Sequence, residues 1–154
     1  MGSLMVFLVL CFSAAALGSV FTNSALKVWY PALKKPTWNP PACVFAPVWT
    51  VLYLMMAVAG WLVWQRTPRG GISLRLVFFS VQLVLNAGWS AVFFGLRRPG
   101  WALAELILLW VFVMLSAVSF WGVHRLAGAL FLPYLLWVTF AAGLNFSVWR
   151  LNRP

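Results

Sequence analysis

Apolar residues run along the chain in five long blocks separated by short polar stretches. A helix that crosses a bilayer needs about 20 mostly apolar residues, and each block reaches that length. The blocks cover residues 3–26, 42–65, 74–96, 99–122 and 127–150. None of them alternates apolar and polar residues as the strands of a membrane barrel do. The pattern therefore predicts an all-α membrane protein, a bundle of five transmembrane helices.

The blocks take up most of the 154 residues, so we expect one domain over residues 1–154. The first block also has a feature of a cleaved signal peptide, since small residues follow an apolar stretch in FLVLCFSAAALGS. However, no Lys or Arg precedes this block, and its apolar stretch continues to Leu26. Signal peptides begin with positive charge and have a shorter apolar region. A transmembrane helix is therefore the favoured interpretation.

Composition excludes the other broad classes of protein. Hydrophobic residues make up 64% of the chain and charged residues 8%, whereas about one quarter of a soluble domain is charged. A soluble domain is therefore excluded, and so is a disordered chain, which has low hydrophobicity. The net charge of +10 resembles that of a nucleic-acid binder. Such proteins gather basic residues on one polar face, whereas these lie between apolar blocks, so no nucleic-acid partner is expected.

Basic residues are more numerous on one side of the predicted bundle. The side with the 27–41 loop and the C-terminus holds seven: Lys27, Lys34, Lys35, Arg97, Arg98, Arg150 and Arg153. The other side holds four: Arg66, Arg69, Arg75 and Arg125. Cytoplasmic loops carry an excess of Lys and Arg. We therefore expect a multi-pass membrane protein whose 27–41 loop and C-terminus lie in the cytoplasm.

Polar side chains inside the apolar blocks are costly to bury in lipid and therefore informative. Gln82, Asn86 and Ser90 recur at every fourth residue, which places them on one helix face. They either join helices by hydrogen bonds or form the polar wall of a ligand cavity, and spacing alone favours neither.

Glu105 is the only acidic residue, and it lies near the start of the fourth block. A structural role near the positive end of the helix dipole, with pairing to Arg97 or Arg98, is favoured over a proton or cation site. An ion-coupled exporter would depend on Glu105 and ranks last among the functions considered.

Small residues recur at four-residue spacing in two blocks, as in close helix contacts. Ala14 and Gly18 show this spacing in the first block, and Ala87, Ala91 and Gly95 in the third. They serve contacts within the bundle or between subunits, and a homodimer through the third block is our expectation. Cys11 and Cys43 lack the spacing of a metal site, so we expect two buried free thiols and no metal.

Tryptophan is unusually frequent, with 11 residues. Seven lie near block ends, where tryptophans form a belt at the membrane surface: Trp29, Trp38, Trp61, Trp64, Trp101, Trp121 and Trp149. Four lie deeper: Trp49, Trp89, Trp110 and Trp137. Two deeper ones belong to faces formed by Phe45, Trp49 and Tyr53 and by Trp137, Ala141 and Leu144. From spacing alone, core packing is favoured for these faces over a pocket for a flat ligand.

The longest connection, WYPALKKPTWNPP from Trp29 to Pro41, contains four prolines and two tryptophans. Flexible linkers are rich in Gly and Ser instead. Proline restricts the backbone, and the aromatic rings have surface to bury. We therefore predict a structured loop between the first two helices that covers one end of the bundle.

Four segments together resemble the TspO family, whose members are also called tryptophan-rich sensory proteins, translocator proteins or peripheral benzodiazepine receptors. The segments are WYPALKKPTWNPP, VFAPVWTVLYLMMAVAG, QLVLNAGWSAVFFG and LPYLLWVTFAAGLNFSVWRLN. The resemblance covers nearly the whole chain and keeps the order of the segments. It implies a five-helix membrane protein, often a homodimer, whose first loop closes a pocket at one end of the bundle.

The resemblance also implies a function in binding or transporting porphyrins such as protoporphyrin IX and haem, together with related lipophilic ligands, in tetrapyrrole homeostasis or stress signalling. No cofactor is required, since the porphyrin or haem is the ligand. The loop residues that it implies are Trp29, Tyr30, Pro36, Trp38, Pro40 and Pro41. The pocket residues are Trp49, Tyr53, Asn86, Trp137, Ala141 and Leu144, and Phe45 shares a face with two of them. The implied pocket residues coincide with the two faces identified by helical spacing. The resemblance therefore favours a ligand pocket over core packing for both faces.

Two further expectations concern the ligand. Lys34 and Lys35 either attract the porphyrin propionates or are ordinary charges of the cytoplasmic side. The cholesterol motif of the family requires Tyr between Leu144 and Arg150, but Phe146 stands there, so high-affinity sterol binding is not expected.

Light-dependent porphyrin breakdown, as in some relatives, is the alternative function. It would depend on Trp49 and Trp137, because the chain lacks a paired acid and base or a metal cluster. An enzyme therefore ranks below a binding or transport protein.

Overall fold

The computed structural model describes residues 2–68 and 73–153, and the regular secondary structure in these ranges consists of helices, without strands. The long helices are α1 (Gly2–Ala25), α3 (Ala42–Arg66), α4 (Leu74–Ser90), α5 (Pro99–Trp121) and α7 (Leu132–Leu151). Shorter ones are α2 (Trp29–Ala32), the π-helix η1 (Ala91–Gly95) and α6 (Arg125–Leu130). Within the described ranges, five spans are long and apolar enough to cross a membrane. The predicted all-α membrane fold is confirmed, while Arg69, one of the charges counted above, lies outside the described residues.

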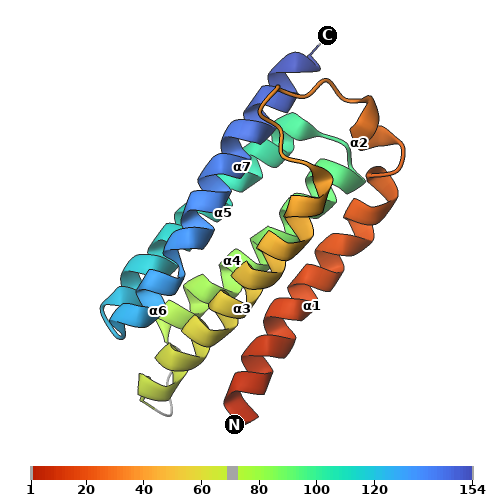
Figure 1. Ribbon diagram of the computed structural model, residues 1–154. Helices are drawn as coiled ribbons and strands as arrows, with labels where there is room; N and C mark the ends of the chain where they lie inside the picture. Colours follow the sequence, from red (N-terminus) through yellow and green to blue (C-terminus); the bar gives the residue numbers. More distant parts are fainter. Residues whose placement is uncertain (1, 69–72, 154) are drawn as a thin grey trace.

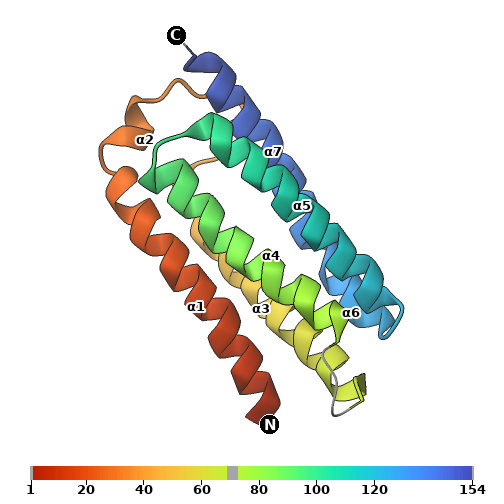
Figure 2. The same ribbon diagram turned by 180° about the vertical axis from the view of Figure 1, so that it is seen from behind.

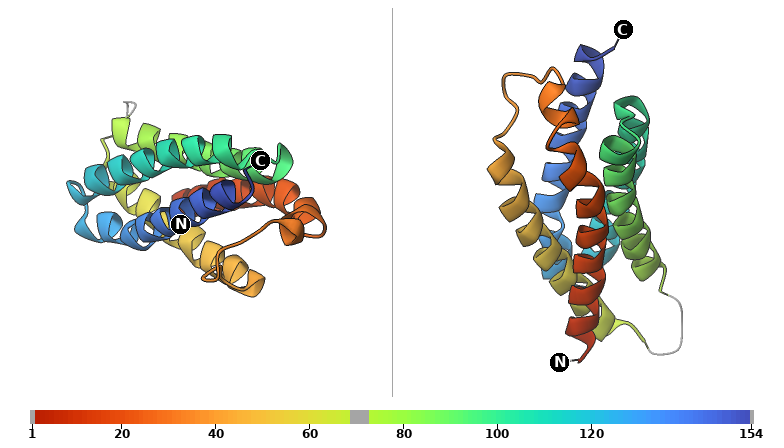
Figure 3. Two further views of the ribbon diagram at one scale, coloured as in Figure 1. Left: turned by 90° about the horizontal axis from the view of Figure 1, so that it is seen from above. Right: turned by 90° about the vertical axis from the view of Figure 1, so that its right-hand side faces the viewer.

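The long helices run side by side with the two termini at opposite ends of the bundle (Figure 1). α1 packs against α3 and α4, and α5 packs against α4 and α7. Figure 2 shows α4 and α5 lying along each other on the back of the bundle. α3 contacts α6 at the end opposite the C-terminus, and from there its axis diverges from that of α7 (Figures 1 and 3). Side chains therefore bridge α3 and α7 at the end that carries the C-terminus.

Aromatic rings fill the core at the α6 end. Phe79 of α4 stacks on Phe120 of α5 with centroids 6.0 Å apart, and Phe131 meets Phe120 edge-on at 5.3 Å. Gly60 of α3 leaves room for the Phe7 ring, since a Cβ there would lie 2.7 Å from it. This end is thus closed by tight packing.

Small residues bring α1 against the third span. Gly18 lies opposite Ser90, where a Cβ would be 3.1 Å from the hydroxyl oxygen, and a Cβ on Gly95 would be 3.0 Å from the Phe21 ring. Ala14 is buried as well. The small residues at these positions therefore serve contacts within the bundle.

Two predicted spans are interrupted. The third ends in η1, where the Leu96 amide donates to the carbonyl of Ala91 at 2.8 Å, and Arg97 then turns the chain with a φ of 56°. The fifth, predicted as one helix over 127–150, breaks at Phe131 between α6 and α7. Pro133 explains that break, because it has no N–H to continue the hydrogen-bond ladder.

The two cysteines are free thiols, and Cys11 is buried as predicted. The predicted burial of Cys43 is wrong, since its side chain is exposed in the first turn of α3. Cys43 precedes Phe45 by two residues, which places it on the opposite side of the helix from the inward face.

Candidate functional site

Six aromatic side chains on α3 and α7 form the centre of the candidate site. We call them the aromatic cluster: Phe45, Trp49, Tyr53, Tyr134, Trp137 and Phe140. The α3 members recur every four residues and the α7 members every three, so each set shares one helix face. Tyr53 and Tyr134 are buried, and the other four are half-buried. The cluster lies where the two helices have diverged.

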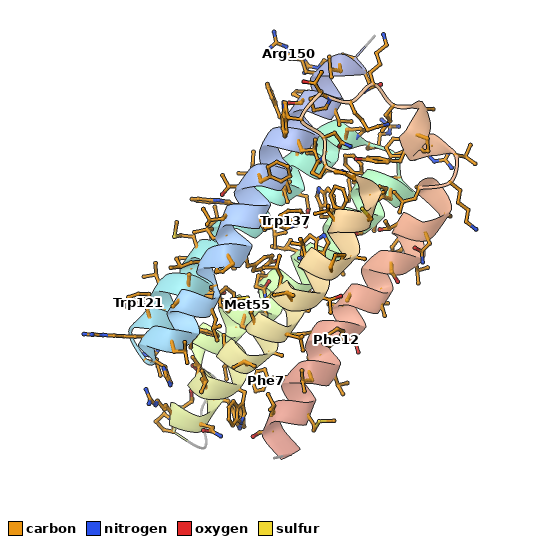
Figure 4. All side chains as sticks on the ribbon, in the orientation of Figure 1. Phe7, Phe12, Met55, Trp121, Trp137 and Arg150 are labelled. Carbon is orange, nitrogen blue, oxygen red and sulfur yellow. The ribbon has the colours of Figure 1, made fainter. Side chains whose placement is uncertain are left out.

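Edge-to-face contacts within the cluster join α3 to α7. Trp49 and Trp137 are nearly perpendicular, at 89°, with ring centroids 6.5 Å apart. Trp49 also meets Tyr134 at 6.2 Å, and Phe45 meets Trp137 at 5.9 Å. Figure 4 shows Trp137 on the side of α7 that faces α3. These arrangements have the geometry that aromatic quadrupoles favour.

A buried amide completes the inner side of the cluster. The Tyr53 hydroxyl donates a hydrogen bond to Oδ1 of Asn86, and Nδ2 of Asn86 donates to the Tyr134 hydroxyl at 2.7 Å. Asn86 is 4% exposed, so this network links α3, α4 and α7 away from solvent. The sequence left two roles open for the polar face of the third span, hydrogen bonding between helices or the wall of a ligand cavity. The bonds of Asn86 join helices, and they lie beside the aromatic rings.

The other members of that polar face behave differently. Ser90 faces Gly18 of α1. Gln82 is completely buried, and neither atom of its amide has a hydrogen-bond partner among the described residues. A buried amide without a hydrogen-bond partner lowers the stability of a folded protein. Gln82 is therefore expected to destabilise the bundle at a point one helical turn from Asn86.

Pocket residues predicted on α7 continue the face of Trp137. Ala141 is half-buried and Leu144 is buried, at 8% exposure. Beyond them, Asn145 accepts a hydrogen bond from the Trp89 indole at 3.2 Å and donates one to the carbonyl of Pro99 at 2.7 Å. Asn145 thereby fixes α7 against the start of α5 above the cluster.

Loop residues fall into two groups. The Tyr30 hydroxyl donates to Asn39 at 3.0 Å, while its ring packs on Phe93 and Phe94, so Tyr30 contacts η1 and not the aromatic cluster. Burial raises the pKa of Tyr30, and the hydrogen bond to Asn39 opposes that rise.

Trp38 contacts the cluster, because its ring lies edge-on to Phe140 at 5.6 Å. Pro41 precedes α3 as its exposed N-cap. The structure thus brings Trp38 together with the predicted pocket face of α7, and it places Tyr30 away from that face.

Lys35 has a structural role within the loop. Its ammonium donates to the carbonyls of Tyr30, Pro31 and Leu33 at 2.8, 3.3 and 3.0 Å, and it lies 4.9 Å from the centre of the Tyr30 ring. A cation at the C-terminal end of a helix satisfies its free carbonyls. Lys34 is exposed, and its ammonium has no hydrogen-bond partner within residues 2–68 and 73–153, so of the two lysines Lys34 is the one that remains a candidate for attracting propionates.

Glu105 lies beside α4 and not in an ion pair. Its Oε1 is 3.5 Å from where a Cβ on Gly88 would lie, and neither carboxylate oxygen has a hydrogen-bond partner among the described residues. The suggested pairing with Arg97 or Arg98 is therefore wrong. Both arginines are exposed in the turn after η1, which directs them away from the helix interface.

The tryptophans outside the cluster divide by exposure. Four rings predicted at the membrane surface are about half exposed or more: Trp38 at 49%, Trp64 at 50%, Trp101 at 68% and Trp121 at 49%. Figure 4 shows Trp121 pointing outward from the bundle. The other three, Trp29, Trp61 and Trp149, are half-buried, so packing against the protein accounts for part of the predicted belt.

Two members of the aromatic cluster were missed from the sequence. Tyr134 and Phe140 lie three residues before and after Trp137. That spacing places them on the face already identified by Trp137 and Ala141. The three-residue spacing in the sequence could therefore have identified both residues. It could not show that Tyr134 bonds to Asn86, because that contact depends on which helices are neighbours.

Comparisons with known proteins cover nearly the whole chain. A profile described as the TspO/MBR family matches residues 7–150. The chain is 41% identical over 150 residues to the tryptophan-rich protein TspO of Chlorobaculum tepidum, and the matched region covers 93% of this chain and 91% of the relative. It is 42% identical over 148 residues to protein CrtK of Rhodobacter capsulatus, with 96% and 91% covered. It is 40% identical over 139 residues to the translocator protein of Homo sapiens, with 88% and 81% covered.

Proposed function

The chain belongs to the TspO/MBR family, and we propose that this multi-pass membrane protein binds a porphyrin of the protoporphyrin IX type at the aromatic cluster. Binding would serve the transport or sensing of porphyrins and related lipophilic molecules. The observation that carries the proposal is the meeting of Trp49 and Trp137 between two diverging helices, at 6.5 Å.

The shape and chemistry of the cluster support a flat aromatic ligand. A porphyrin is a broad apolar disc, and indole rings offer large faces for offset stacking. Because α3 and α7 are joined at this end by side chains, a disc can enter by rotation of Trp49 and Trp137 without breaking backbone contacts. Asn86 supplies a polar group deeper in the site, where a pyrrole nitrogen could form a hydrogen bond.

Charge at the same end supports an anionic ligand. Lys34, Arg150 and Arg153 are exposed near the loop and the end of α7, and Figure 4 shows Arg150 at that end. The sequence contains one acidic residue, Glu105, and it lies within α5. A positive field at the mouth attracts the two propionates of a porphyrin and raises its rate of association.

A titration of the purified protein in lipid nanodiscs tests the proposal. Protoporphyrin IX should bind saturably, with a shift of its Soret absorbance. Its dimethyl ester is a matched ligand without the two charges and should bind more weakly, with less dependence on salt. Equal affinity for the ester and for protoporphyrin IX would show that the basic residues do not contribute to binding. Absence of saturable binding by protoporphyrin IX would refute the proposed function.

Cholesterol serves as the competing ligand in the same assay. Phe146 lacks the hydroxyl that the sterol motif requires, and its ring is 45% exposed on the outer side of α7. We expect cholesterol to compete poorly with protoporphyrin IX. Displacement of the porphyrin at comparable cholesterol concentrations would favour a sterol site instead.

A further inference from the structure

At the end of the bundle opposite the C-terminus, the last residue of α3 is bonded to the turn between α5 and α6. Nη1 of Arg66 donates to the carbonyl of Val123 at 3.1 Å, and α3 and α6 also pack against each other. Arg125 begins α6, two residues after Val123, which is at most about 7 Å of chain. Two arginines from different helices therefore meet where these helix ends join. We call Arg66 and Arg125 the arginine junction.

The backbone of the junction is held by several contacts. The His124 amide donates to the Phe120 carbonyl at 2.8 Å, and the Gly128 amide donates to the His124 carbonyl at 3.1 Å. A Cβ on Gly128 would lie 2.7 Å from the Cα of Trp121, so α6 packs directly on the last turn of α5. Because the backbone is already fixed, a ligand that binds here orders side chains alone, which lowers the cost of binding.

Most hydrogen-bond donors of the junction are available to a ligand. An arginine side chain carries five N–H donors, and both arginines are exposed. The bond to Val123 is the one that Arg66 makes within residues 2–68 and 73–153, and the Arg125 guanidinium makes none there. A phosphate group accepts paired hydrogen bonds from the planar fork of an arginine. The junction therefore has the donors that a phosphate requires.

The chain supplies no negative charge near the junction. Its one acidic residue, Glu105, lies near the start of α5, about 24 Å along that helix from Trp121. This distance exceeds the Debye length of about 8 Å in physiological salt. The C-terminus lies at the opposite end of the bundle, whereas α4 begins at this end with the exposed Arg75 in its first turn (Figure 1). The counter-charge of the junction therefore comes from outside the chain.

The side chains around the junction place it at the depth of the lipid head groups. Trp64 and Trp121 are 50% and 49% exposed, and Figure 4 shows Trp121 pointing outward. Exposed indoles at the ends of membrane helices lie among the head groups. Leu126, beside Arg125, is 54% exposed and offers an apolar surface to an acyl chain. A ligand that matches both the arginines and these apolar side chains is a phospholipid.

Topology alone does not account for arginines at this end. The charge count predicts that the loop and the C-terminus are cytoplasmic, which places the junction on the other side of the membrane. Lys and Arg are concentrated in cytoplasmic loops, so the positive-inside rule explains the basic residues of the loop side and leaves Arg66 and Arg125 unexplained. A negatively charged ligand at the junction explains them.

We propose that Arg66 and Arg125 bind the phosphate of an anionic phospholipid, whose acyl chains lie beside the exposed indoles of Trp64 and Trp121. The bound head group bridges α3 to α6 at the end from which α3 and α7 diverge. This site is at the opposite end of the bundle from the aromatic cluster, and it does not depend on the proposed porphyrin binding.

Native mass spectrometry of the detergent-solubilised protein tests the site. Phosphatidylglycerol should bind more tightly than phosphatidylcholine with the same acyl chains. Arg66→Gln/Arg125→Gln should weaken the first phosphatidylglycerol about thirtyfold, since each basic residue near an anionic surface contributes about fivefold. Arg97→Gln/Arg98→Gln is the matched control, because it removes the same charge from an exposed turn at the other end, and it should keep wild-type affinity. Unchanged affinity in Arg66→Gln/Arg125→Gln, or an equal loss in the control, would overturn the proposal.

Two measurements on the wild-type protein avoid any effect of the substitutions on folding. Phosphatidylglycerol with a photoreactive acyl chain should crosslink to peptides that contain the end of α3 or residues 121–126, and crosslinks confined to the loop end would overturn the site. Glycerol phosphate, a water-soluble source of the same phosphate chemistry, should not displace the lipid at millimolar concentration. Displacement by glycerol phosphate would show a site for free phosphate and would overturn the assignment to a phospholipid.

Discussion

Asn86 donates a hydrogen bond of 2.7 Å to the hydroxyl of Tyr134, which ties the third membrane span to the fifth at the inner side of the aromatic cluster. The same amide accepts from Tyr53 of α3. One side chain therefore sets the relative positions of three helices, and it does so beside Trp49 and Trp137. The network explains how a site made largely of aromatic rings keeps a defined shape.

Asn86→Leu should destabilise the protein, because it leaves the hydroxyls of Tyr53 and Tyr134 buried without a partner. We expect a loss of about 2 kcal/mol in the free energy of unfolding, measured by SDS titration in mixed micelles. The triple variant Tyr53→Phe/Asn86→Leu/Tyr134→Phe removes every polar atom of the network and should recover part of the loss. An Asn86→Leu variant as stable as wild type would show that the network does not hold the helices.

Gln82→Leu should have the opposite effect. The Gln82 amide is buried without a hydrogen-bond partner among the described residues, so an apolar side chain of similar size removes a desolvation cost. The expected gain is about 1 kcal/mol in the free energy of unfolding. Gln65→Leu, at an exposed position of α3, is the control and should change little. A loss of stability in Gln82→Leu would indicate that the amide has a partner, such as a bound water.

Gly128→Ala should strain the contact between α5 and α6. A Cβ at this position would lie 2.7 Å from the Cα of Trp121 and 2.8 Å from its nitrogen, and neither backbone atom can rotate away. We expect a loss of about 2 kcal/mol, measured by the same titration. Gly122→Ala is the comparison, since its Cβ would meet the Ser119 carbonyl at an ordinary 3.7 Å. Equal stability of the two variants would contradict the close approach.

The charge count predicts the orientation of the protein in the membrane. Seven basic residues on the loop side against four on the other predict that the C-terminus is cytoplasmic. A C-terminal fusion to green fluorescent protein, expressed in a bacterial host, should therefore fluoresce. The matching fusion to alkaline phosphatase should be inactive, and activity of that fusion would reverse the assignment.

The sequence predicted the spans, and the helix faces of the candidate site, for a simple physical reason. Bilayer thickness fixes the length of an apolar helix, so the five blocks identify the helices directly. Helical spacing likewise identifies the inward faces that carry Trp49 and Trp137. The family resemblance then favoured a pocket over core packing at these faces, and the structure shows the two rings meeting between diverging helices.

What the sequence did not predict depends on contacts between distant segments. The bonds of Asn86 to two tyrosines require knowledge of which helices are neighbours. The Asn152 side chain likewise bonds to the backbone of Lys34, which lies 118 positions away in sequence. The role of Lys35 depends on the short helix α2, whose carbonyls it satisfies. Pro133, by contrast, was visible in the sequence, and its missing N–H would have predicted the break before α7.

The affinity of protoporphyrin IX for Trp49→Phe/Trp137→Phe tests the central claim most directly. It should be read from the Soret absorbance of the porphyrin, because the variants differ in tryptophan content. Loss of both indoles from the site should weaken binding about tenfold or more, at roughly 1 kcal/mol for each ring. Trp101→Phe/Trp121→Phe removes two exposed indoles and should bind as the wild type does. Wild-type affinity in Trp49→Phe/Trp137→Phe would contradict the assignment of the aromatic cluster as the porphyrin site.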